Sequence, residues 1–246
     1  MSEPQRLDQL LVTLSLFASR SRARDAIQRG TVTVDGKLVT KPGALFTEHA
    51  AIAIDDPAQD YVSRAALKLV AALDHFQLDP QGRHCLDVGA STGGFTEVLL
   101  ERGAAHVTAI DVGHGQMHPR IAGDPRVTNI EGLNARNLTI EDIGGPVSFI
   151  VSDVSFISLK LALAPALALA EPQARAALLV KPQFEAGRDA IGKAGLLKDP
   201  ASAPAVAAEL ERWFIEDMGW RSLGLIPSPI TGGDGNQEFL LAGIKP

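Results

Sequence analysis

The chain has 246 residues, 46% of them hydrophobic and 21% charged, which is ordinary for a globular protein with ample material for a core. The formal net charge of −6 argues against a protein that is basic throughout and binds nucleic acid over its whole surface. No apolar run approaches the roughly 20 residues that span a bilayer, and the N-terminus lacks a signal-peptide core, so we expect a cytoplasmic protein that does not enter a membrane. The single cysteine, Cys85, excludes an internal disulfide and a cysteine-based metal cluster.

Positive charge is concentrated near the N-terminus. Between Pro4 and Pro42, seven basic and three acidic residues give a net charge of +4, which leaves −10 on the rest of the chain. A local basic face can bind phosphates on an otherwise acidic protein. From charge alone, a solvated helix face explains this segment better than an RNA-binding surface does.

The first 60 residues predict two helices and a small sheet. Leucines at helical spacing indicate a helix from Leu7 to Leu14, and a second helix is expected over residues 21–29 with Ser21 as its N-cap. Alternating residues around Asp35-Gly36 predict a tight hairpin, and residues 51–54 predict another strand. The polar residues that follow read as a linker, so we expect a first domain at 1–56, a linker at 57–62 and a second domain at 63–246.

Residues 6–43 resemble the RNA-binding module named after ribosomal protein S-four. The resemblance is carried by Arg6-Leu7-Asp8, Ser19-Arg20-Ser21, Gly30, Gly36 and Lys41-Pro42, among others. It implies that the Ser-Arg-Ser helix start and nearby basic residues meet RNA phosphates, for which the planar guanidinium of arginine is well suited. The candidate RNA-binding residues are Arg6, Arg20, Arg22, Arg24, Arg29, Lys37 and Lys41.

The second domain contains a glycine-rich stretch, CLDVGASTGGFTEVLLERG, at residues 85–103. An apolar run, a glycine turn and a helix-periodic segment predict the strand–turn–helix unit of a nucleotide-binding α/β domain. The spacing matches neither a phosphate-binding loop nor G-x-G-x-x-G; it looks like the S-adenosylmethionine loop of class I methyltransferases, although a tight turn in another α/β fold is the alternative. The candidate cofactor-binding residues are Asp87, near the cofactor's ammonium, and Gly89, Ala90, Ser91, Thr92, Gly93, Gly94 and Phe95.

Two further strands suggest the rest of a cofactor site. Residues 107–113 predict a strand ending in Asp111, whose carboxylate can accept hydrogen bonds from a ribose diol beside Val112. An ordinary cap at the strand end is the alternative for Asp111. A third strand should end near Glu131, and Asn134 just beyond it could face adenine.

Four charged residues follow or precede the remaining elements. Lys68 lies on a helix that we expect to begin at Ser63, Asp153 and Lys181 follow the fourth and fifth strands, and Glu238 precedes the last. In a doubly wound sheet all four side chains can meet beside the cofactor. Asp153 is a candidate for cofactor binding as well as for catalysis. The sequence Asp153-Val154-Ser155-Phe156 lacks the prolines typical of amine-directed methyltransferases, and Cys85 is misplaced for carbon methylation, so an oxygen acceptor remains.

Lys-Asp-Lys-Glu is the tetrad of FtsJ/RrmJ-type ribose 2′-O-methyltransferases, and with the N-terminal module the chain resembles the TlyA family of bacterial ribosomal RNA methyltransferases, also called haemolysins. The blocks DVGASTGGFTEVLL, SDVSFISL, VKPQFEAG and SPITGGDGNQEF carry the resemblance. It implies an α/β chain: a small α+β RNA-binding domain, then a Rossmann-like class I domain with a mostly parallel seven-stranded sheet. It also implies S-adenosylmethionine as cofactor, ribosomal RNA or ribosomal subunits as partner, cytidine 2′-hydroxyls as target, and Lys68, Asp153, Lys181 and Glu238 as catalytic residues.

Other functions remain open at this level. A non-catalytic RNA-binding or ribosome-assembly protein, a membrane-acting haemolysin and a small-molecule O-methyltransferase are the alternatives. His114 and His118 have the spacing of a metal pair, but without a third ligand nearby we expect incidental loop histidines and no metal. The sequence decides neither the ribosomal subunit and nucleotide nor between a monomer and a weak dimer.

Overall fold

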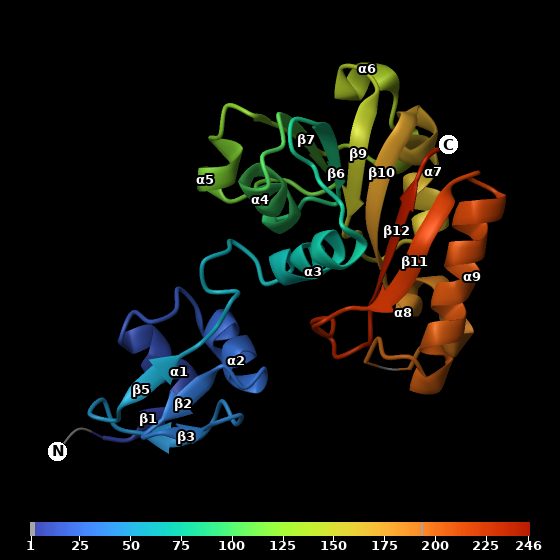
Figure 1. Ribbon diagram of the computed structural model, residues 1–246. Helices are drawn as coiled ribbons and strands as arrows, with labels where there is room; N and C mark the ends of the chain where they lie inside the picture. Colours follow the sequence, from blue (N-terminus) through green and yellow to red (C-terminus); the bar gives the residue numbers. More distant parts are fainter. Residues whose placement is uncertain (1–2, 193) are drawn as a thin grey trace. The chain divides into compact units, whose positions relative to one another are not determined.

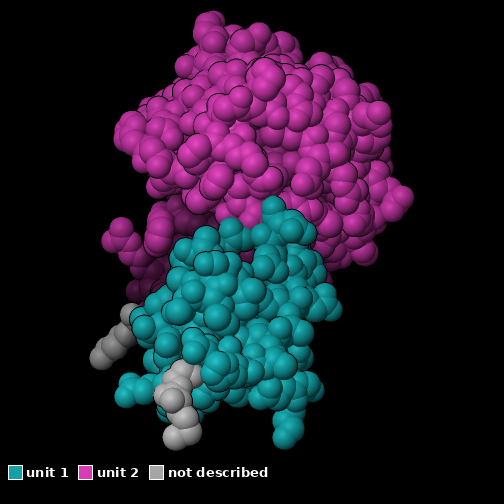
Figure 2. Space-filling view, turned by 90° about the vertical axis from the view of Figure 1, so that its left-hand side faces the viewer, with its two compact units in different colours: residues 1–60 teal, residues 61–246 magenta. Residues whose placement is uncertain are grey.

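The chain divides into two compact units, residues 1–60 and 61–246, which Figure 2 colours separately. The computed structural model describes residues 3–192 and 194–246. Each unit has its own hydrophobic core, so each is described by itself.

The first unit packs two helices against a small antiparallel sheet (Figure 1). The helices are α1 (Leu7–Thr13) and α2 (Arg20–Gln28), and the three-stranded sheet has the order β3 (Lys37–Leu38), β2 (Val32–Val34), β5 (Ile52–Ile54). A short pair, β1 (Gln5–Arg6) and β4 (Leu45–Phe46), adds a second ladder that we did not predict. Asp35 and Gly36 both have positive φ, at 50° and 73°, as the predicted two-residue hairpin requires.

The N-cap of α2 is Ser19, so the prediction of Ser21 was wrong. The backbone at Ser19 is extended, with φ −153° and ψ 157°, and its Oγ accepts the N–H of Arg22 at 3.3 Å. Ser21 already lies inside the first turn, and its hydroxyl lies 3.0 Å from that of Ser19. The helix therefore begins at Arg20. With Ser21 as its N-cap it would have begun two positions later.

The second unit is built on one seven-stranded sheet, which confirms the predicted fold class (Figure 1). Its order is β11 (Arg221–Pro227), β12 (Phe239–Ile244), β10 (Ala170–Val180), β9 (Val147–Ser152), β6 (His84–Val88), β7 (His106–Asp111), β8 (Val127–Glu131). The strands from β10 to β8 pair in parallel, and β12 runs antiparallel to β10 and β11. The central strands are apolar on both sides because both faces are covered.

Helices on the two faces bury two separate cores. Helices α3 (Ala66–Phe76) and α4 (Gly94–Glu101) pack on one face, and α7 (Leu159–Leu169) and α9 (Ala203–Glu216) on the other. Ser63 does not cap α3 as predicted: its Oγ accepts the N–H of Ala65 in the turn before the helix, which begins three residues later at Ala66. Three one-turn helices, α5 (Pro119–Ala122), α6 (Ile140–Ile143) and α8 (Pro182–Glu185), are too short for periodicity to reveal.

Candidate active site

The site lies where the order of the sheet changes direction. From β6 the chain moves outward to β7 and β8, and then returns to β9 on the other side of β6. Loops leaving the carboxyl ends of β6 and β9 therefore diverge, and ligands of open α/β sheets bind in the crevice that this divergence opens. The two loops begin at Gly89 and Asp153, and the backbone N–H of Asp153 donates to the carbonyl of Val88 at 3.1 Å.

The glycine loop is shaped by close packing as much as by backbone conformation. Gly89 has φ 84°, and a Cβ there would come within 2.9 Å of both the carbonyl oxygen of Asp153 and a methyl carbon of Val154. Gly93 has φ 91°, and a Cβ would meet Ile121 at 3.0 Å. Only glycine satisfies both demands without strain, so the loop backbone approaches its neighbours more closely than any other residue allows.

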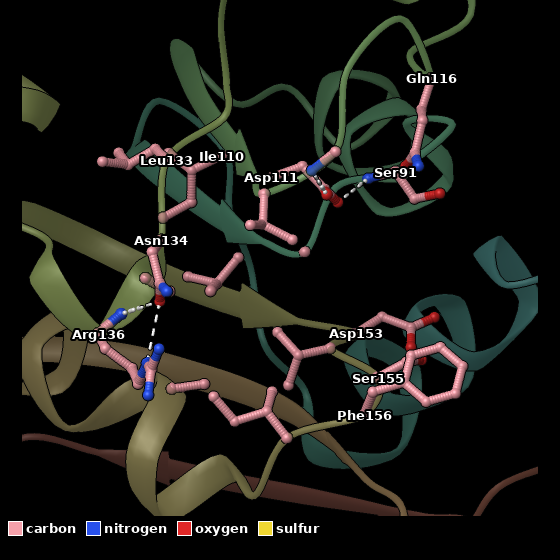
Figure 3. A pocket seen from close by; sticks show the side chains of 18 residues that line it. Ser91, Ile110, Asp111, Gln116, Leu133, Asn134, Arg136, Asp153, Ser155 and Phe156 are labelled. Carbon is pink, nitrogen blue, oxygen red and sulfur yellow. Dashed lines mark hydrogen bonds between the residues drawn. The ribbon is translucent and has the colours of Figure 1, made fainter.

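Asp111, at the end of β7, organises the loops on its side of the crevice. Its two carboxylate oxygens accept the backbone N–H groups of Ser91 at 2.8 Å and Gly113 at 2.7 Å (Figure 3). Each oxygen keeps a further lone pair, so this carboxylate can still accept from a ligand hydroxyl. The neighbouring Val112 is 70% exposed, an apolar surface beside a polar one.

Asp87 is enclosed in the core beneath the loop. It is fully buried, with Oδ2 accepting from the Thr96 hydroxyl at 2.7 Å and Oδ1 without a partner among the described residues. Burial raises the pKa of this carboxyl to about 7, and the negative charges of Asp153 and Asp111 act in the same direction. A cation brought to this carboxylate would therefore be stabilised.

A cavity of ≈ 550 Å³ opens at the crevice, within the roughly 300–1,000 Å³ range typical of small-molecule sites. Its wall combines apolar side chains, among them Ile110, Val112 and Leu133, with the polar side chains of Asp111 and Asp153. Asn134, at the side seen at left in Figure 3, accepts from both the backbone N–H and the Nε of Arg136. The lining includes Gly89, Ser91, Asp111, Val112, Gln116, Asn134, Arg136, Asp153, Ser155 and Phe156.

The four predicted catalytic residues form two ion pairs at this edge of the sheet. Lys68 of α3 pairs with Glu238 at the start of β12, and both side chains are almost fully buried. The Nζ of Lys181 lies 2.5 Å from Oδ1 of Asp153. Because β12 runs antiparallel to β10, Glu238 just before it lies at the edge where β9 and β10 end, so the sheet brings all four together.

The two pairs share one electrostatic environment. Burial raises the pKa of Glu238, and the Lys68 ammonium opposes that shift. The charges of Lys181 and Asp153 also act on Glu238. Gly232 leaves space for this carboxylate, since a Cβ there would lie 2.8 Å from Oε1 of Glu238. Asp153 lines the cavity, whereas Lys68, Lys181 and Glu238 do not contribute to its wall.

Not every predicted cofactor residue reaches the cavity. Gly89, Ser91, Asp111, Val112, Asn134 and Asp153 line it. Asp87 and Phe95 are buried in the core, and Ala90, Thr92, Gly93 and Gly94 shape the loop without lining the cavity. Of these six, only Thr92 is exposed, and the five others are buried behind the surface of the loop.

Among the lining residues that were missed from sequence are Gln116, Arg136, Ser155 and Phe156. Ser155 and Phe156 directly follow a predicted site residue and could have been found from that position. Phe156 is 91% exposed and has φ 66°, a left-handed conformation that is strained for a bulky residue and concentrates at functional sites. Gln116 lies in an irregular segment and Arg136 in a one-turn 3₁₀ helix (Ala135–Asn137), and no periodicity reveals either.

In the first unit, the predicted RNA-binding residues have different environments. The buried carboxylate of Asp8 bridges Arg6 and Arg20, whose side chains are 48% and 58% exposed. The hydrogen bonds from the two guanidiniums lower the pKa of Asp8. Arg24, Lys37 and Lys41 are also exposed.

Arg29 has an internal role instead. Its guanidinium is 15% exposed, donates to both oxygens of Asp56 at 2.8 and 2.9 Å, and pairs with Asp25 at 2.8 Å. Arg22 donates to the carbonyl of Ala58 at 3.0 Å. These contacts fasten the end of the first unit to α2 and leave Arg29 little surface for a ligand.

The histidine pair at 114 and 118 shows no metal-site geometry. Nδ1 of His118 accepts the N–H of Arg120 and caps α5. Across residues 3–192 and 194–246, no three His, Cys, Asp or Glu side chains gather as a metal site would require. Within the same ranges, every helix is too short or too polar to cross a membrane.

Comparison with known proteins agrees with this architecture. Residues 61–245 match the family of FtsJ-like methyltransferases, and residues 5–52 match the S4 domain. The chain is 45% identical over 243 residues to the 16S/23S rRNA (cytidine-2′-O)-methyltransferase TlyA of Mycobacterium tuberculosis, covering 98% of this chain and 90% of that protein. It is 38% identical to Hemolysin A of Brachyspira hyodysenteriae, with 96% and 98% covered.

A solved structure from Streptococcus thermophilus, named as a hemolysin, superposes with a TM-score of 0.75 at 38% identity, covering 100% of this chain and 90% of that one. Its agreement, like that of the two relatives, extends over both units. The chain therefore belongs to the TlyA family, in which an S4 domain precedes an FtsJ-like methyltransferase domain.

Proposed function

We propose that the protein transfers a methyl group from S-adenosylmethionine to the ribose 2′-hydroxyl of a cytidine in ribosomal RNA. The observation that carries this is the pairing of Lys68 with Glu238 and of Lys181 with Asp153 beside a small-molecule cavity. The M. tuberculosis relative is named for this reaction, and the chain contains both of its domains. Each lysine is paired with a carboxylate, Lys68 with the buried Glu238 and Lys181 with the partly exposed Asp153, which suits the transfer of a proton from a hydroxyl.

The residues around the cavity fit the cofactor. The Asp111 carboxylate retains lone pairs for a ribose diol, and Val112, Ile110 and Leu133 supply apolar surface for a purine ring. The orphaned, buried Oδ1 of Asp87 offers negative charge beneath the glycine loop, as a ligand with an ammonium group would need. When bound, S-adenosylmethionine supplies an electrophilic methyl group on a sulfonium.

The residues of the chain then have separable tasks. Transfer is an in-line displacement, so catalysis depends largely on alignment of the acceptor hydroxyl. In its neutral form, Lys181 would accept on Nζ the proton that the 2′-hydroxyl loses. Asp153 holds that nitrogen in place and supplies negative charge at the cavity wall. Glu238 fixes Lys68 behind the site.

The first unit supplies affinity for RNA in this proposal. Arg6 and Arg20 share one buried carboxylate, so the two guanidiniums are held close together while half of each side chain remains exposed. A pair of fixed, exposed guanidiniums suits a phosphodiester backbone. The rest of the chain is acidic, which makes a second broad phosphate-binding face there less favourable. Affinity for RNA should therefore come mainly from the basic first unit and should fall steeply as the salt concentration rises.

Methyl transfer to ribosomal subunits tests the proposal. Small and large subunits that lack the modification are incubated separately with methyl-labelled S-adenosylmethionine and with wild-type protein, Lys181→Ala or Lys181→Arg. We expect label in RNA, recovered as an alkali-stable 2′-O-methyl dinucleotide, with wild type alone. Arginine keeps the positive charge but does not give up its proton, so it separates charge from proton transfer.

The same experiment distinguishes the competing functions. A cofactor-binding protein that labels neither subunit supports an RNA-binding assembly factor. Label that persists in both Lys181 variants overturns the assignment of Lys181 as the base. Leakage of dye-loaded liposomes by the purified protein, compared with Lys181→Ala, examines the activity implied by the hemolysin names of some relatives.

A further inference from the structure

We propose that Ser155 is a positioning residue that sets the direction in which Lys181 receives the substrate proton. The inference rests on the proposed function, because that proposal assigns Lys181 as the base of the reaction. The tetrad does not include this serine, which lies within the SDVSFISL block and had no role assigned to it from sequence. Its hydroxyl lies on the first loop after β9, two residues beyond Asp153.

The Nζ of Lys181 is held from two sides by this loop. It donates a hydrogen bond of 2.7 Å to Oγ of Ser155 and lies 2.5 Å from Oδ1 of Asp153. The two acceptors belong to one short segment, whereas Lys181 follows the neighbouring strand β10. Lys181 is 8% exposed, while Ser155 is exposed and lines the cavity. Ser155 is therefore both accessible from the cavity and in contact with the buried Lys181.

The two contacts differ in kind. The approach to Ser155 has the alignment of a hydrogen bond. The approach to Asp153 does not, and its buried Oδ1 has no hydrogen-bond partner among the described residues. Charge attraction between Lys181 and Asp153 fixes the position of the nitrogen but only weakly its rotation, because Coulomb attraction is not directional. The hydroxyl of Ser155 supplies the directional contact.

Rotation about the terminal bond matters because of the geometry of an amine. An ammonium has three N–H bonds, of which Ser155 accepts one and Asp153 attracts a second. After loss of the third proton, the lone pair occupies the remaining tetrahedral direction. With one N–H held by Ser155 and another drawn to Asp153, that direction is fixed. Without Ser155 the amine can turn, and the lone pair is aligned with the acceptor hydroxyl for only part of the time.

The inference predicts an effect on turnover and not on binding. Ser155→Ala should lower kcat about 10- to 100-fold, the scale of loss expected when a reacting group is misaligned. The KM for RNA and the Kd for S-adenosylmethionine should stay within about twofold. Ser155→Thr keeps a hydroxyl at the same position and should recover most of kcat, since the residue is exposed and has room for a methyl group. Ser202→Ala, at the start of α9, removes a hydroxyl that donates only to the Asp199 carbonyl and serves as the matched control.

A second measurement does not depend on methyl transfer. In ¹⁵N NMR of the lysine side chains of the full-length protein, the Nζ group of Lys181 should be more ordered and exchange its protons more slowly in wild type and Ser155→Thr than in Ser155→Ala. Equal kcat in wild type and Ser155→Ala overturns the inference. So does an equal loss in the Ala and Thr variants, or weakened cofactor binding in both, because a hydroxyl-dependent alignment predicts neither.

Failure of the proposed function would look different. If wild-type protein labels no RNA while binding the cofactor, the proposed reaction fails and the NMR comparison decides the role of Ser155. An unchanged Nζ signal in Ser155→Ala then rules out the positioning role. If wild type is active and only Ser155→Ala loses turnover, both the reaction and the inference stand.

Discussion

Lys68 and Glu238 form a buried ion pair although 170 positions separate them in the chain. Lys68 is 5% exposed on α3, and Glu238 is 2% exposed at the start of β12. The pair joins the first helix of the catalytic unit to its last strand, and the second lysine–carboxylate pair lies within its electrostatic range. Charges removed from water to this degree are stable only when each has its partner.

Removing one partner of this ion pair should therefore lower the free energy of unfolding more than removing both partners does. Glu238→Gln leaves the buried ammonium of Lys68 without a carboxylate and should lower the free energy of unfolding by about 3–5 kcal/mol. The double variant Lys68→Met with Glu238→Gln removes both charges and should recover most of that loss. Urea unfolding of the four proteins in the cycle measures the coupling. Additive losses would show that the two side chains do not interact.

Asp87 should make stability depend on pH. Its folded-state pKa is about 7 against an ordinary value of 3.8, so the folded state binds the proton more tightly than the unfolded state does. The stabilisation is complete below about pH 4 and is lost as pH rises through 7. Since one pKa unit corresponds to about 1.4 kcal/mol, the loss is on the order of 4 kcal/mol.

Comparison with Asp87→Asn isolates this contribution. Asparagine stays neutral, so the stability of the variant relative to wild type should rise between pH 5 and pH 8, as measured by urea unfolding without cofactor. Other titrating groups affect both proteins equally and cancel in the difference. A difference that is constant over this range would contradict the raised pKa.

Arg20, the first residue of α2, and Arg29, just after its last, provide a matched pair for testing RNA binding. Arg20→Ala removes an exposed guanidinium and should weaken binding to RNA, lowering the slope of log affinity against log salt by about 0.7 for a lost contact with a single strand. Stability should change by less than about 1 kcal/mol, because the lost guanidinium is exposed and Asp8 keeps Arg6 as its partner. Filter binding at several salt concentrations gives the slope.

Arg29→Ala should show the reverse pattern. It leaves the buried carboxylate of Asp56 without its bidentate partner and should cost about 3 kcal/mol of stability. At a temperature where the variant is fully folded, RNA affinity should match that of wild type. If Arg29→Ala lowered the slope of log affinity against log salt as Arg20→Ala does, Arg29 would belong to the RNA-binding surface.

Gly89→Ala tests how the cavity is shaped. The added methyl group must occupy a backbone with φ 84° and lie 2.9 Å from the carbonyl of Asp153. Neither the conformation nor a main-chain contact relaxes cheaply, so the loop should move and weaken S-adenosylmethionine binding by at least about 10-fold. Gly82→Ala, with φ 69° and open space around it, carries the conformational strain alone. Isothermal titration of both variants separates the two causes, and equal affinities would show that the close approach is unimportant.

Local signals in the chain were enough for the fold class and for the position of the site. Buried apolar strands, the glycine turn after β6 and the Asp35-Gly36 hairpin are short-range patterns, and the structure contains each of them. The charged residues at strand ends could be placed at one edge because parallel strands share their carboxyl ends. These signals did not give the helix starts, since Ser19 and Ser21 compete for the cap of α2 and Ser63 caps a turn that precedes α3.

The linear chain carried the identity of the chemical groups but not their partners. Nothing in the sequence distinguishes Arg29, bound to Asp56, from Arg20, exposed beside Asp8; nor does it show that Lys181 is anchored by Ser155. Those pairings depend on which side chains packing brings within a few ångströms across tens or hundreds of positions. Hydrophobic periodicity is local and fixes the elements, whereas burial, charge pairing and the direction of a hydrogen bond arise only when the elements meet.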